Sequence, residues 1–491
     1  MYSFRPPQVD LLSLAPVIIV AITGGLGLIL EMINPRKSNR LIAKVSGVGL
    51  VVAMVATFLG LDGSEASTFG GMALRDGFGS IITLILLLIA FLSLLFSEAY
   101  MEEKKIPFGE FYPLMLWATG GAIIMSTSMS LLMIFIGLET LSIALYVLCG
   151  LSRSEVKSEE SAIKYFLLGA FASAFLLYGI AFFYGATSSL SLSVLRSDTS
   201  PVSATIHFSS IQSIMMVLGL GMILVGLCFK TALVPFHQWA PDVYQGAPTN
   251  VTAFMSAASK VAALAVLTRV LVASRDLEAI WFPALFWIAI MTMIVGNVVA
   301  LVQTDTKRIL AYSSIAHSGY VLVAILAIAS GKVVADYTPI LYYLLSYSIM
   351  TVGAFAAISL MARGGTESTS VDRLNGLWKR NPTAAVSLLV LMLSLVGLPP
   401  FSGFIGKVLI FQQAVNAGLL PLAIVLALCS IVSASYYLKI AFAAFASEPS
   451  GDQEPFIARP STSTQIAYIA SAIGVILISI FYSPITSYFT R

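Results

Sequence analysis

Stretches of about twenty apolar residues recur along almost the whole chain, and they limit its fold more than any other feature. Three of them run over Leu11 to Ile33, Phe78 to Phe96 and Ile340 to Met361. A helix of this length matches the roughly 30 Å hydrocarbon core of a bilayer. Only 10% of the 491 residues are charged, against roughly 25% in soluble domains. We therefore expect an all-α, polytopic membrane protein, in which the first run is a retained helix and not a cleaved leader.

Counting the apolar runs gives about fourteen transmembrane helices. Their predicted starts lie near Leu11, Leu41, Phe78, Phe111, Ser128, Ile163, Ile211, Ala247, Ala279, Lys307, Thr338, Ala384, Leu419 and Ser463. The longest connection, from Ser188 to His207, is rich in Ser and Thr and is too short for a separate globular domain. The chain is therefore predicted to lie almost entirely within the lipid bilayer.

Lysine and arginine gather in every second connection between the predicted helices. These odd-numbered connections contain Arg36, Lys37, Arg40, Lys44, Lys104, Lys105, Arg153, Lys157, Lys307, Arg308, Arg363, Arg373, Lys379 and Arg380. The even-numbered connections are poor in basic residues, and the second has only Arg75. The positive-inside rule therefore places the odd connections in the cytoplasm and both termini on the opposite side. The small net charge of +3 gives no sign of nucleic-acid binding.

Two segments carry proline where an apolar run would otherwise continue. They are Phe229 to Trp239, with Pro235, and Leu395 to Phe404, with Pro399 and Pro400. An odd number of predicted helix starts lies between them, so the two segments should cross the bilayer in opposite directions. Inverted repeats around a transport site have this pattern, although proline is also common in ordinary membrane helices.

Two ionisable side chains are predicted to lie near the middle of the membrane. Glu139 follows the apolar run Leu131 to Leu138, and Lys260 lies among the small and apolar residues from Ala253 to Ala263. A charge at this depth costs about 2.5–3.5 kcal/mol on insertion scales, so each side chain should face other helices and have a partner. Burial disfavours the charged ammonium and brings proton exchange by Lys260 toward the working pH range. The alternative is a structural role, with a neutral acid or a lysine bonded to helix carbonyls.

Lys230 and Lys407 lie beside the two proline segments. Proline removes a backbone donor and leaves carbonyls unpaired, which is tolerated at membrane depth only inside protein or beside water. Each predicted break therefore implies local hydration, and a lysine beside bound water can pass a proton along it. In continuous helices the same lysines would extend toward the lipid headgroups instead.

Three further residues carry weaker signals. Lys164 closely follows the charged run from Ser154 to Glu160, at the predicted start of its helix, so a solvated lysine fits as well as a functional one. His237 and His317 could relay protons near neutral pH. Hydrogen bonds between helices would explain both histidines equally well.

The sequence gives no sign of a redox cofactor bound by this chain. It contains no GxxxxGK[ST] phosphate loop, no GxGxxG after a strand and no recognisable pair of haem-ligating histidines. Cys149, Cys228 and Cys429 lie singly in apolar segments, where we expect them to pack and not to bind metal or form disulfides. Any driving energy should therefore come from partner chains or from an ion gradient.

The residues from Phe229 to Thr249 closely resemble the signature of the antiporter-like subunits of respiratory complex I. They read Phe-Lys-Thr-Ala-Leu-Val-Pro-Phe-His-Gln-Trp-Ala-Pro-Asp-Val-Tyr-Gln-Gly-Ala-Pro-Thr. Three further stretches agree with this family: 137–139, 307–315 and 397–407. Together they extend the resemblance over most of the chain, from about Phe111 to Phe445.

Within this family the chain is similar to the N-type, or subunit-2 type, chains. The matching stretches are Pro-Asp-Val-Tyr-Gln-Gly-Ala-Pro and Ala-Ser-Lys-Val-Ala. L-type chains carry a long lateral helix at the carboxyl end, whereas this sequence stops shortly after Ile485. M-type chains usually have a glutamate at the position of Lys407.

The resemblance implies a fold of fourteen helices with two inverted five-helix repeats, in which the seventh and twelfth helices are broken. It divides the chain into an N-terminal three-helix region (1–110), a first bundle (111–275), a second bundle (276–446) and a C-terminal helix (447–491). It also implies roles for six residues in proton translocation. Glu139 would pair with Lys164 or Lys230, Lys260 would be the central carrier, Lys407 would connect to the exit side or to a neighbouring subunit, and His317 would be a relay.

The implied function is that of a membrane-arm subunit of NADH-quinone oxidoreductase in the bacterial inner membrane. NAD, FMN, iron–sulfur clusters and quinone would all be bound by partner subunits, and the direct partners would be neighbouring antiporter-like and small helical subunits. Quinone reduction elsewhere would alter the interaction of Glu139 with a lysine, and so change how strongly Lys260 holds its proton. The alternative is a subunit of a multi-component cation/proton antiporter or of a membrane-bound hydrogenase. A stand-alone transporter would need a polar substrate site that the sequence does not show.

Overall fold

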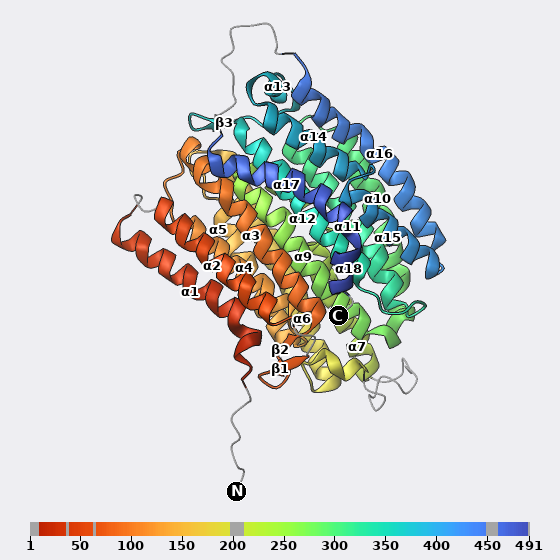
Figure 1. Ribbon diagram of the computed structural model, residues 1–491. Coiled ribbons are helices and arrows are strands. Elements are labelled where there is room, and N and C mark those ends of the chain that lie inside the picture. The colour runs from red at the N-terminus through yellow and green to blue at the C-terminus, as the bar shows by residue number, and fades with distance from the viewer. Residues whose placement is uncertain (1–8, 36–38, 62–64, 197–210, 448–459, 490–491) are drawn as a thin grey trace.

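The computed structural model describes residues 9–35, 39–61, 65–196, 211–447 and 460–489, which form helices packed side by side (Figure 1). Within these residues, twelve helices are long and apolar enough to cross a membrane, and α4 and α14 are shorter apolar helices. The helices are α1 (Leu11–Ile33), α2 (Asn39–Leu59), α3 (Gly77–Glu103), α4 (Phe111–Ser126), α5 (Leu131–Cys149), α6 (Val156–Thr187), α7 (Ile211–Lys230), α8 (Trp239–Gly246), α9 (Thr249–Ala273), α10 (Glu278–Leu301), α11 (Thr306–Ala329), α12 (Thr338–Ile358), α13 (Leu377–Arg380), α14 (Pro382–Val396), α15 (Ser402–Asn416), α16 (Leu420–Phe445), α17 (Thr462–Ile480) and α18 (Tyr482–Phe489). The all-α, polytopic fold expected from the apolar runs is confirmed.

Short elements occupy the connections. Four 3₁₀ turns, η1 to η4, and four short strands are present, namely η1 (Leu192–Arg196), η2 (Arg275–Leu277), η3 (Ser359–Met361), η4 (Val371–Leu374), β1 (Ala66–Thr68), β2 (Ala73–Arg75), β3 (Ala362–Arg363) and β4 (Thr366–Glu367). β1 pairs with β2 and β3 with β4, both antiparallel. The predicted Ser/Thr-rich connection is described only as far as Arg196, and its remainder lies outside the described residues, as do Arg36 and Lys37.

The connections separate to the two ends of the bundle. The β3–β4 hairpin lies at one end, where Gly365 N donates to Glu103 O and Asp305 bridges to Ser370. The β1–β2 hairpin lies at the other end with the start of α1 (Figure 1), and Leu74 N donates there to Thr127 O. We call the end with the β3–β4 hairpin the odd end and the end with the β1–β2 hairpin the even end, because they hold the odd-numbered and the even-numbered connections.

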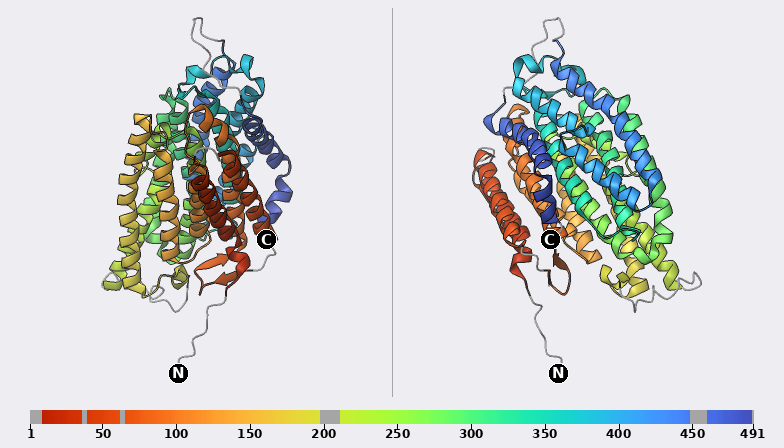
Figure 2. Two further views of the ribbon diagram at one scale, coloured as in Figure 1. Left: turned by 90° about the vertical axis from the view of Figure 1, so that its left-hand side faces the viewer. Right: turned by 45° about the vertical axis from the view of Figure 1, so that its right-hand side comes forward.

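The centre of the bundle consists of α9, α11 and α12. The apolar stretch of α9 is completely buried, and those of α11 and α12 are almost completely buried. Figure 2 shows α1 and α2 at one edge of the bundle and α16 toward the opposite edge. Lys260 lies on α9 and His317 on α11, so the fold places both at its most protected positions.

Two transmembrane helices are interrupted where the sequence carries its proline segments. α7 ends at Lys230 and α8 begins at Trp239, while α14 ends at Val396 and α15 begins at Ser402. Gly397, directly after α14, has a φ of 86°. Glycine adopts this left-handed conformation without steric cost and commonly ends helices. Both predicted breaks are therefore present, whereas the division into four regions stays a prediction.

One helix begins earlier than predicted. α6 starts at Val156, not near Ile163, because the charged run forms its first turn instead of a connection. Glu159 lies in that turn, where the positive end of the helix dipole favours an acid. Lys164 consequently lies about two turns inside α6 and not at its start.

Candidate functional site

Glu139 is held on α5 by an unusually close approach of α4. A Cβ added to Gly137 would lie 2.7 Å from Gly121 O, so only glycine permits this spacing. The carboxylate of Glu139 is partly buried and accepts a hydrogen bond from the Ser173 hydroxyl of α6. Within the described residues it forms no ion pair, so its direct partner is a serine and not one of the two predicted lysines.

Lys230 reaches the same helix one turn further along. Its Nζ donates to Ser142 Oγ at 2.8 Å and to the Tyr165 hydroxyl at 3.0 Å. Ser142 follows Glu139 by three residues on α5, so the two side chains share a face. The carboxylate attracts the ammonium across this short separation. Lys230 is thus coupled to Glu139 through space, while the Ser142 hydroxyl that it bonds donates in turn to Leu138 O.

Lys164 points to other acids. Its Nζ lies 2.7 Å from Glu160 of the same helix and 2.9 Å from Asp242 of α8, and its side chain is 42% exposed. It therefore helps to join α6 and α8 at the surface of the chain. His237 lies in the break between α7 and α8, with Nδ1 buried and without a hydrogen-bond partner in the described part of the chain.

Among the predicted residues, Lys260 has the environment that is least favourable for a charged side chain. Only 2% of its surface is exposed, and its Nζ finds no hydrogen-bond acceptor among the described residues. Its neighbours on α9 include Ala257, Ala258 and Val261, which offer no polar side-chain atom. A buried ammonium without a partner is strongly disfavoured, so this site favours the neutral amine.

His317 lies between the charges of two helices. Lys407 and Lys260 both lie close enough to act electrostatically on its ring when they are protonated. Its Nδ1 is 2.7 Å from the Tyr343 hydroxyl and its Nε2 is 2.9 Å from the Tyr437 hydroxyl. The structure therefore brings Lys260, His317 and Lys407 into one electrostatically connected group.

Lys407 is bound by the second helix break. Its Nζ donates to Leu395 O at 3.1 Å and to Val396 O at 2.7 Å, the last carbonyls of α14. These carbonyls lack partners within the helix and form the negative end of its dipole. The Lys407 ammonium also lies 5.3 Å from the ring centre of Tyr320. A charged lysine is consequently stabilised here by main-chain groups.

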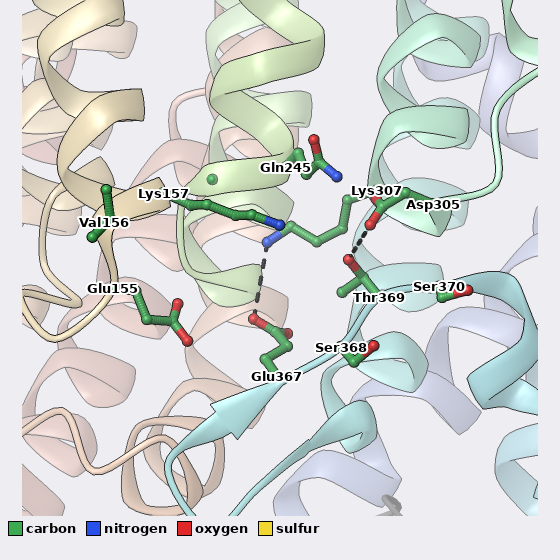
Figure 3. A pocket seen from close by; sticks show the side chains of 11 residues that line it. Glu155, Val156, Lys157, Gln245, Asp305, Lys307, Glu367, Ser368, Thr369 and Ser370 are labelled. Carbon is green, nitrogen blue, oxygen red and sulfur yellow. Dashed lines mark hydrogen bonds and ion pairs between the residues drawn. The ribbon is translucent and has the colours of Figure 1, made fainter.

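A polar cavity of about 500 Å³ opens at the odd end of the bundle (Figure 3). Its lining comes from α6, α8, α11 and the β3–β4 hairpin, and comprises Glu155, Val156, Lys157, Gln245, Gly246, Asp305, Lys307, Glu367, Ser368, Thr369 and Ser370. We call it the vestibule. Connections of both predicted bundles therefore meet around one water-accessible space.

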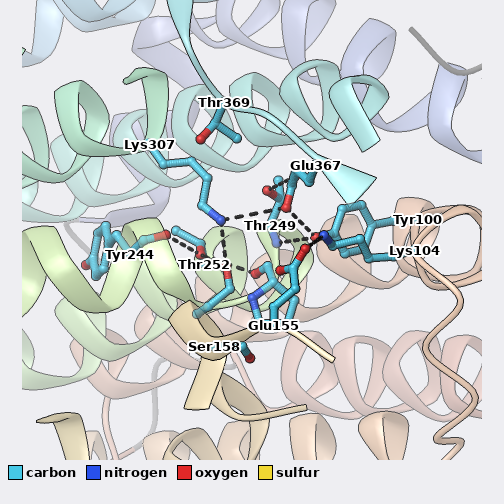
Figure 4. Close-up of polar contacts among 12 residues, drawn as sticks. Tyr100, Lys104, Glu155, Ser158, Tyr244, Thr249, Thr252, Lys307, Glu367 and Thr369 are labelled. Carbon is cyan, nitrogen blue, oxygen red and sulfur yellow. Dashed lines mark hydrogen bonds and ion pairs between the residues drawn. The ribbon is translucent and has the colours of Figure 1, made fainter. Parts of the chain in front are cut away.

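Buried charges line the inner wall of the vestibule (Figure 4). Lys307 donates to Ala247 O at 2.6 Å and lies 4.0 Å from Glu367. Glu367 accepts from the Tyr100 hydroxyl at 2.8 Å, and Lys104 pairs with Glu155. The side chains of Lys104 and Lys307 are almost completely buried. Every charge in this wall has an opposite charge beside it.

Sequence reasoning missed the vestibule. It used Lys104 and Lys307 only as signs of orientation, because their acidic partners lie 51 and 60 residues away along the chain. The one available signal was the presence of Glu155 and Glu367 in connections of the same parity. That signal identifies the end of the bundle but not the pairing.

Known proteins share the sequence pattern and the fold of this chain. Residues 128–433 match the family described as NADH:quinone oxidoreductase/Mrp antiporter, transmembrane. The chain is 41% identical over 433 residues to NADH-quinone oxidoreductase subunit N of Trichlorobacter lovleyi, covering 88% of this chain and 87% of that protein. A chain of respiratory complex I from Thermus thermophilus with bound aureothin is 34% identical, with a TM-score of 0.81 and coverage of 96% and 98%. A chain of the Mrp complex from a Dietzia species is 22% identical, with a TM-score of 0.84 and coverage of 98% and 96%.

The chain belongs to the NADH:quinone oxidoreductase and Mrp antiporter family of transmembrane proteins. Its resemblance to the N-type chains is confirmed, and it functions as a membrane-arm, proton-translocating subunit of NADH-quinone oxidoreductase. The likeness to the Mrp complex, at 22% identity, shows a shared fold alone. The antiporter alternative therefore has weaker support than the complex I assignment.

Proposed function

We propose that protons cross this subunit through a line of groups formed by Glu139, Lys230, Lys260, His317 and Lys407, which we call the midplane line. The observation that carries the proposal is the buried Nζ of Lys260, which has no hydrogen-bond partner among the described residues. A purely structural lysine would be expected to bond helix carbonyls. Lys260 can instead gain or lose a proton without breaking a hydrogen bond among the described residues. Each change nevertheless alters the electrostatic field in the buried centre of the bundle.

Coupling to quinone reduction would act through the first helix break. Movement of Glu139 or Lys230 changes the field at the next ionisable group, because charge interactions are strong where water is excluded. The partners of Lys230 are the hydroxyls of Ser142 and Tyr165, and Ser142 also donates to Leu138 O. Hydroxyls can exchange hydrogen-bond partners and can therefore follow such a movement. The driving reaction and its cofactors, NAD, FMN, iron–sulfur clusters and quinone, would lie on partner subunits, with neighbouring antiporter-like and small helical subunits as direct contacts.

The vestibule supports proton uptake at the odd end. Its acids and lysines line a cavity large enough for water, and Thr249 of α9 donates to Glu367 at 2.5 Å. The excess of basic residues at this end supports a cytoplasmic location for it, with both termini outside, in a bacterial inner membrane. Uptake from the cytoplasm is the direction that a respiratory proton pump requires.

Replacement of Lys260 in the assembled complex tests the proposal. Lys260→Met removes the amine, and Lys260→Arg keeps a positive charge that does not dissociate in the working pH range. Both variants should lose quinone-linked proton pumping by at least about 100-fold through this subunit. The exposed lysine of α2 provides the control, because Lys44→Met should pump normally. Full pumping by Lys260→Arg at normal assembly would show that a fixed charge suffices, and would refute the carrier role.

A further inference from the structure

Four buried side chains form a continuous hydrogen-bonded chain through His317. Ser313 of α11 bonds the Tyr437 hydroxyl of α16, which lies 2.9 Å from Nε2 of His317. Nδ1 of the same ring lies 2.7 Å from the Tyr343 hydroxyl of α12. None of the four residues is more than 3% exposed. Three helices thus contribute to one polar thread in an apolar interior, which we call the tyrosine chain.

The hydrogen bonds of the tyrosine chain can run in either of two directions. A neutral imidazole donates from one nitrogen and accepts at the other, and a hydroxyl donates one hydrogen. The bonds can therefore all point from Ser313 to Tyr343 or all point the other way, and each arrangement satisfies His317. Passage of one proton along the chain converts the first arrangement into the second. A histidine bonded to two hydroxyls on opposite sides has the connectivity of a relay.

The residues of the tyrosine chain come from different depths in the membrane. Ser313 lies seven residues from the start of α11 at the odd end, a rise of about 10 Å, and Tyr343 lies five residues from the start of α12 at the even end, about 8 Å. The ring of Tyr343 packs against Gly406, next to Lys407, where an added Cβ would lie 2.8 Å away. The Tyr343 hydroxyl lies beside Nδ1 of His317, and its ring extends from there toward the even end.

A second pair of hydroxyls connects this region to α9. Tyr347 of α12 donates to Ser314 Oγ at 2.7 Å and approaches Ser256 O at 3.3 Å. Ser256 precedes Lys260 by one turn of α9, and Ser314 follows Ser313 directly. The groups around Lys260 and the beginning of the tyrosine chain are consequently neighbours.

We propose that Ser313, Tyr437, His317 and Tyr343 carry the proton from the midplane line toward the even end, and that the two tyrosines are relay residues of the pump. The inference rests on the proposed function. A proton arriving at Ser313 Oγ displaces the hydroxyl proton onto the Tyr437 oxygen, and Tyr437 passes its own proton to Nε2. Nδ1 releases its proton to the Tyr343 oxygen, whose hydroxyl proton passes to a water molecule on the even side. The ring is left protonated at Nε2, and it regains the starting tautomer when Nε2 gives this proton to water and Nδ1 takes one from water, while the hydroxyls rotate back.

An adjacent tyrosine provides a matched control. Tyr437→Phe and Tyr343→Phe remove a hydroxyl bonded to His317, whereas Tyr342→Phe removes a hydroxyl bonded to Ile478 O. In the assembled complex in vesicles, the first two variants should lose about tenfold or more of the quinone-linked pumping rate, and the control should keep its rate. Equal pumping by all three variants would overturn the relay. If Lys260→Arg abolishes pumping while the tyrosine variants pump normally, only this inference fails.

A second measurement separates relay from packing. Replacing Tyr437 with 3,5-difluorotyrosine keeps the ring and the hydroxyl but makes the hydroxyl more acidic. A relay predicts an altered pumping rate for this replacement, and no change for the same replacement at Tyr342, whose hydroxyl bonds Ile478 O. An unchanged rate at Tyr437 would mean that its hydroxyl only holds His317 in place, and would contradict the proposal even if Tyr437→Phe is inactive.

Discussion

The two helix breaks hold their lysines in different ways. At the first, Lys230 bonds side-chain hydroxyls and feels the charge of Glu139. At the second, Lys407 bonds two main-chain carbonyls and lies over Tyr320. The backbone differs too. Gly397 takes its left-handed conformation freely, whereas Ala232, two residues after the end of α7 and with a φ of 55°, has a Cβ that costs about 1–2 kcal/mol in that region.

This difference predicts different roles for the two helix breaks in the pumping cycle. Hydroxyls and a neighbouring acid can rearrange, so the first break is suited to respond to an event elsewhere in the complex. Carbonyls at a helix end cannot rotate away, so the second break offers its lysine a constant environment. Backbone strain at the first break fits a segment that changes during the cycle. Five substitutions would sharpen or break this comparison.

The largest effect is expected from Lys230→Met. It removes the group through which Glu139 influences the midplane line, so quinone-linked pumping should fall at least about 100-fold. Pumping and quinone reduction should be measured together in vesicles that contain the assembled complex, with Lys44→Met as the control for a lysine lost from a membrane helix. Pumping within about twofold of normal would place the responsive site elsewhere.

Glu139→Gln should have the next largest effect. Glutamine can still accept the Ser173 hydrogen bond, but it lacks the charge that attracts Lys230. Loss of roughly 1.4 kcal/mol of this attraction corresponds to about a tenfold fall in pumping. Hydrogen exchange should also change around residues 226–239 and remain unchanged around 394–407. Equal changes at both breaks would contradict their independence.

The backbone of the two breaks should respond with opposite signs. Gly397→Ala places a Cβ 2.9 Å from Cδ of Lys407 and forces alanine into a left-handed conformation, which should destabilise the subunit by about 1–3 kcal/mol. Ala232→Gly relieves strain and should stabilise it by about 1 kcal/mol or less. Thermal unfolding of the purified complex measures both. A stabilising Gly397→Ala would disprove the fixed environment of Lys407.

Lys164→Met should have the smallest effect. Its ion pairs with Glu160 and Asp242 are partly exposed, and such pairs contribute about 0–1 kcal/mol. Pumping should stay within about twofold of normal. A loss as large as that of Lys230→Met would show that Lys164 approaches Glu139 during the cycle, and that the first break has two responsive lysines.

The sequence was informative wherever the signal is local. Apolar runs locate the helices, the prolines locate the two breaks, and an uninterrupted apolar flank locates Glu139 and Lys260 at membrane depth. One local rule misled: the charged run before Lys164 resembles a connection, but it forms the first turn of α6 because helix ends tolerate charge.

The sequence could not predict contacts between residues that lie far apart along the chain. Tyr437 lies 120 residues from His317, and tyrosines in apolar helices usually indicate packing or an interfacial position. The partner of Glu139 was missed for a related reason, since Ser173 belongs to a helix of many small residues that gives its hydroxyl no special mark. Only the fold decides which hydroxyls meet an ionisable group.

The lysines buried in the vestibule wall have a consequence for how the subunit is made. Lys104 and Lys307 belong to the basic residues that would orient the chain as it enters the membrane, yet both end in closed ion pairs. Their positive charges can therefore orient the chain only early in membrane insertion, before Glu155 and Glu367 pair with them. Replacing Glu155 or Glu367 would therefore leave the membrane topology unchanged, but Lys104 or Lys307 would be buried without its ion pair in the folded protein. The resulting defect would appear late in biogenesis.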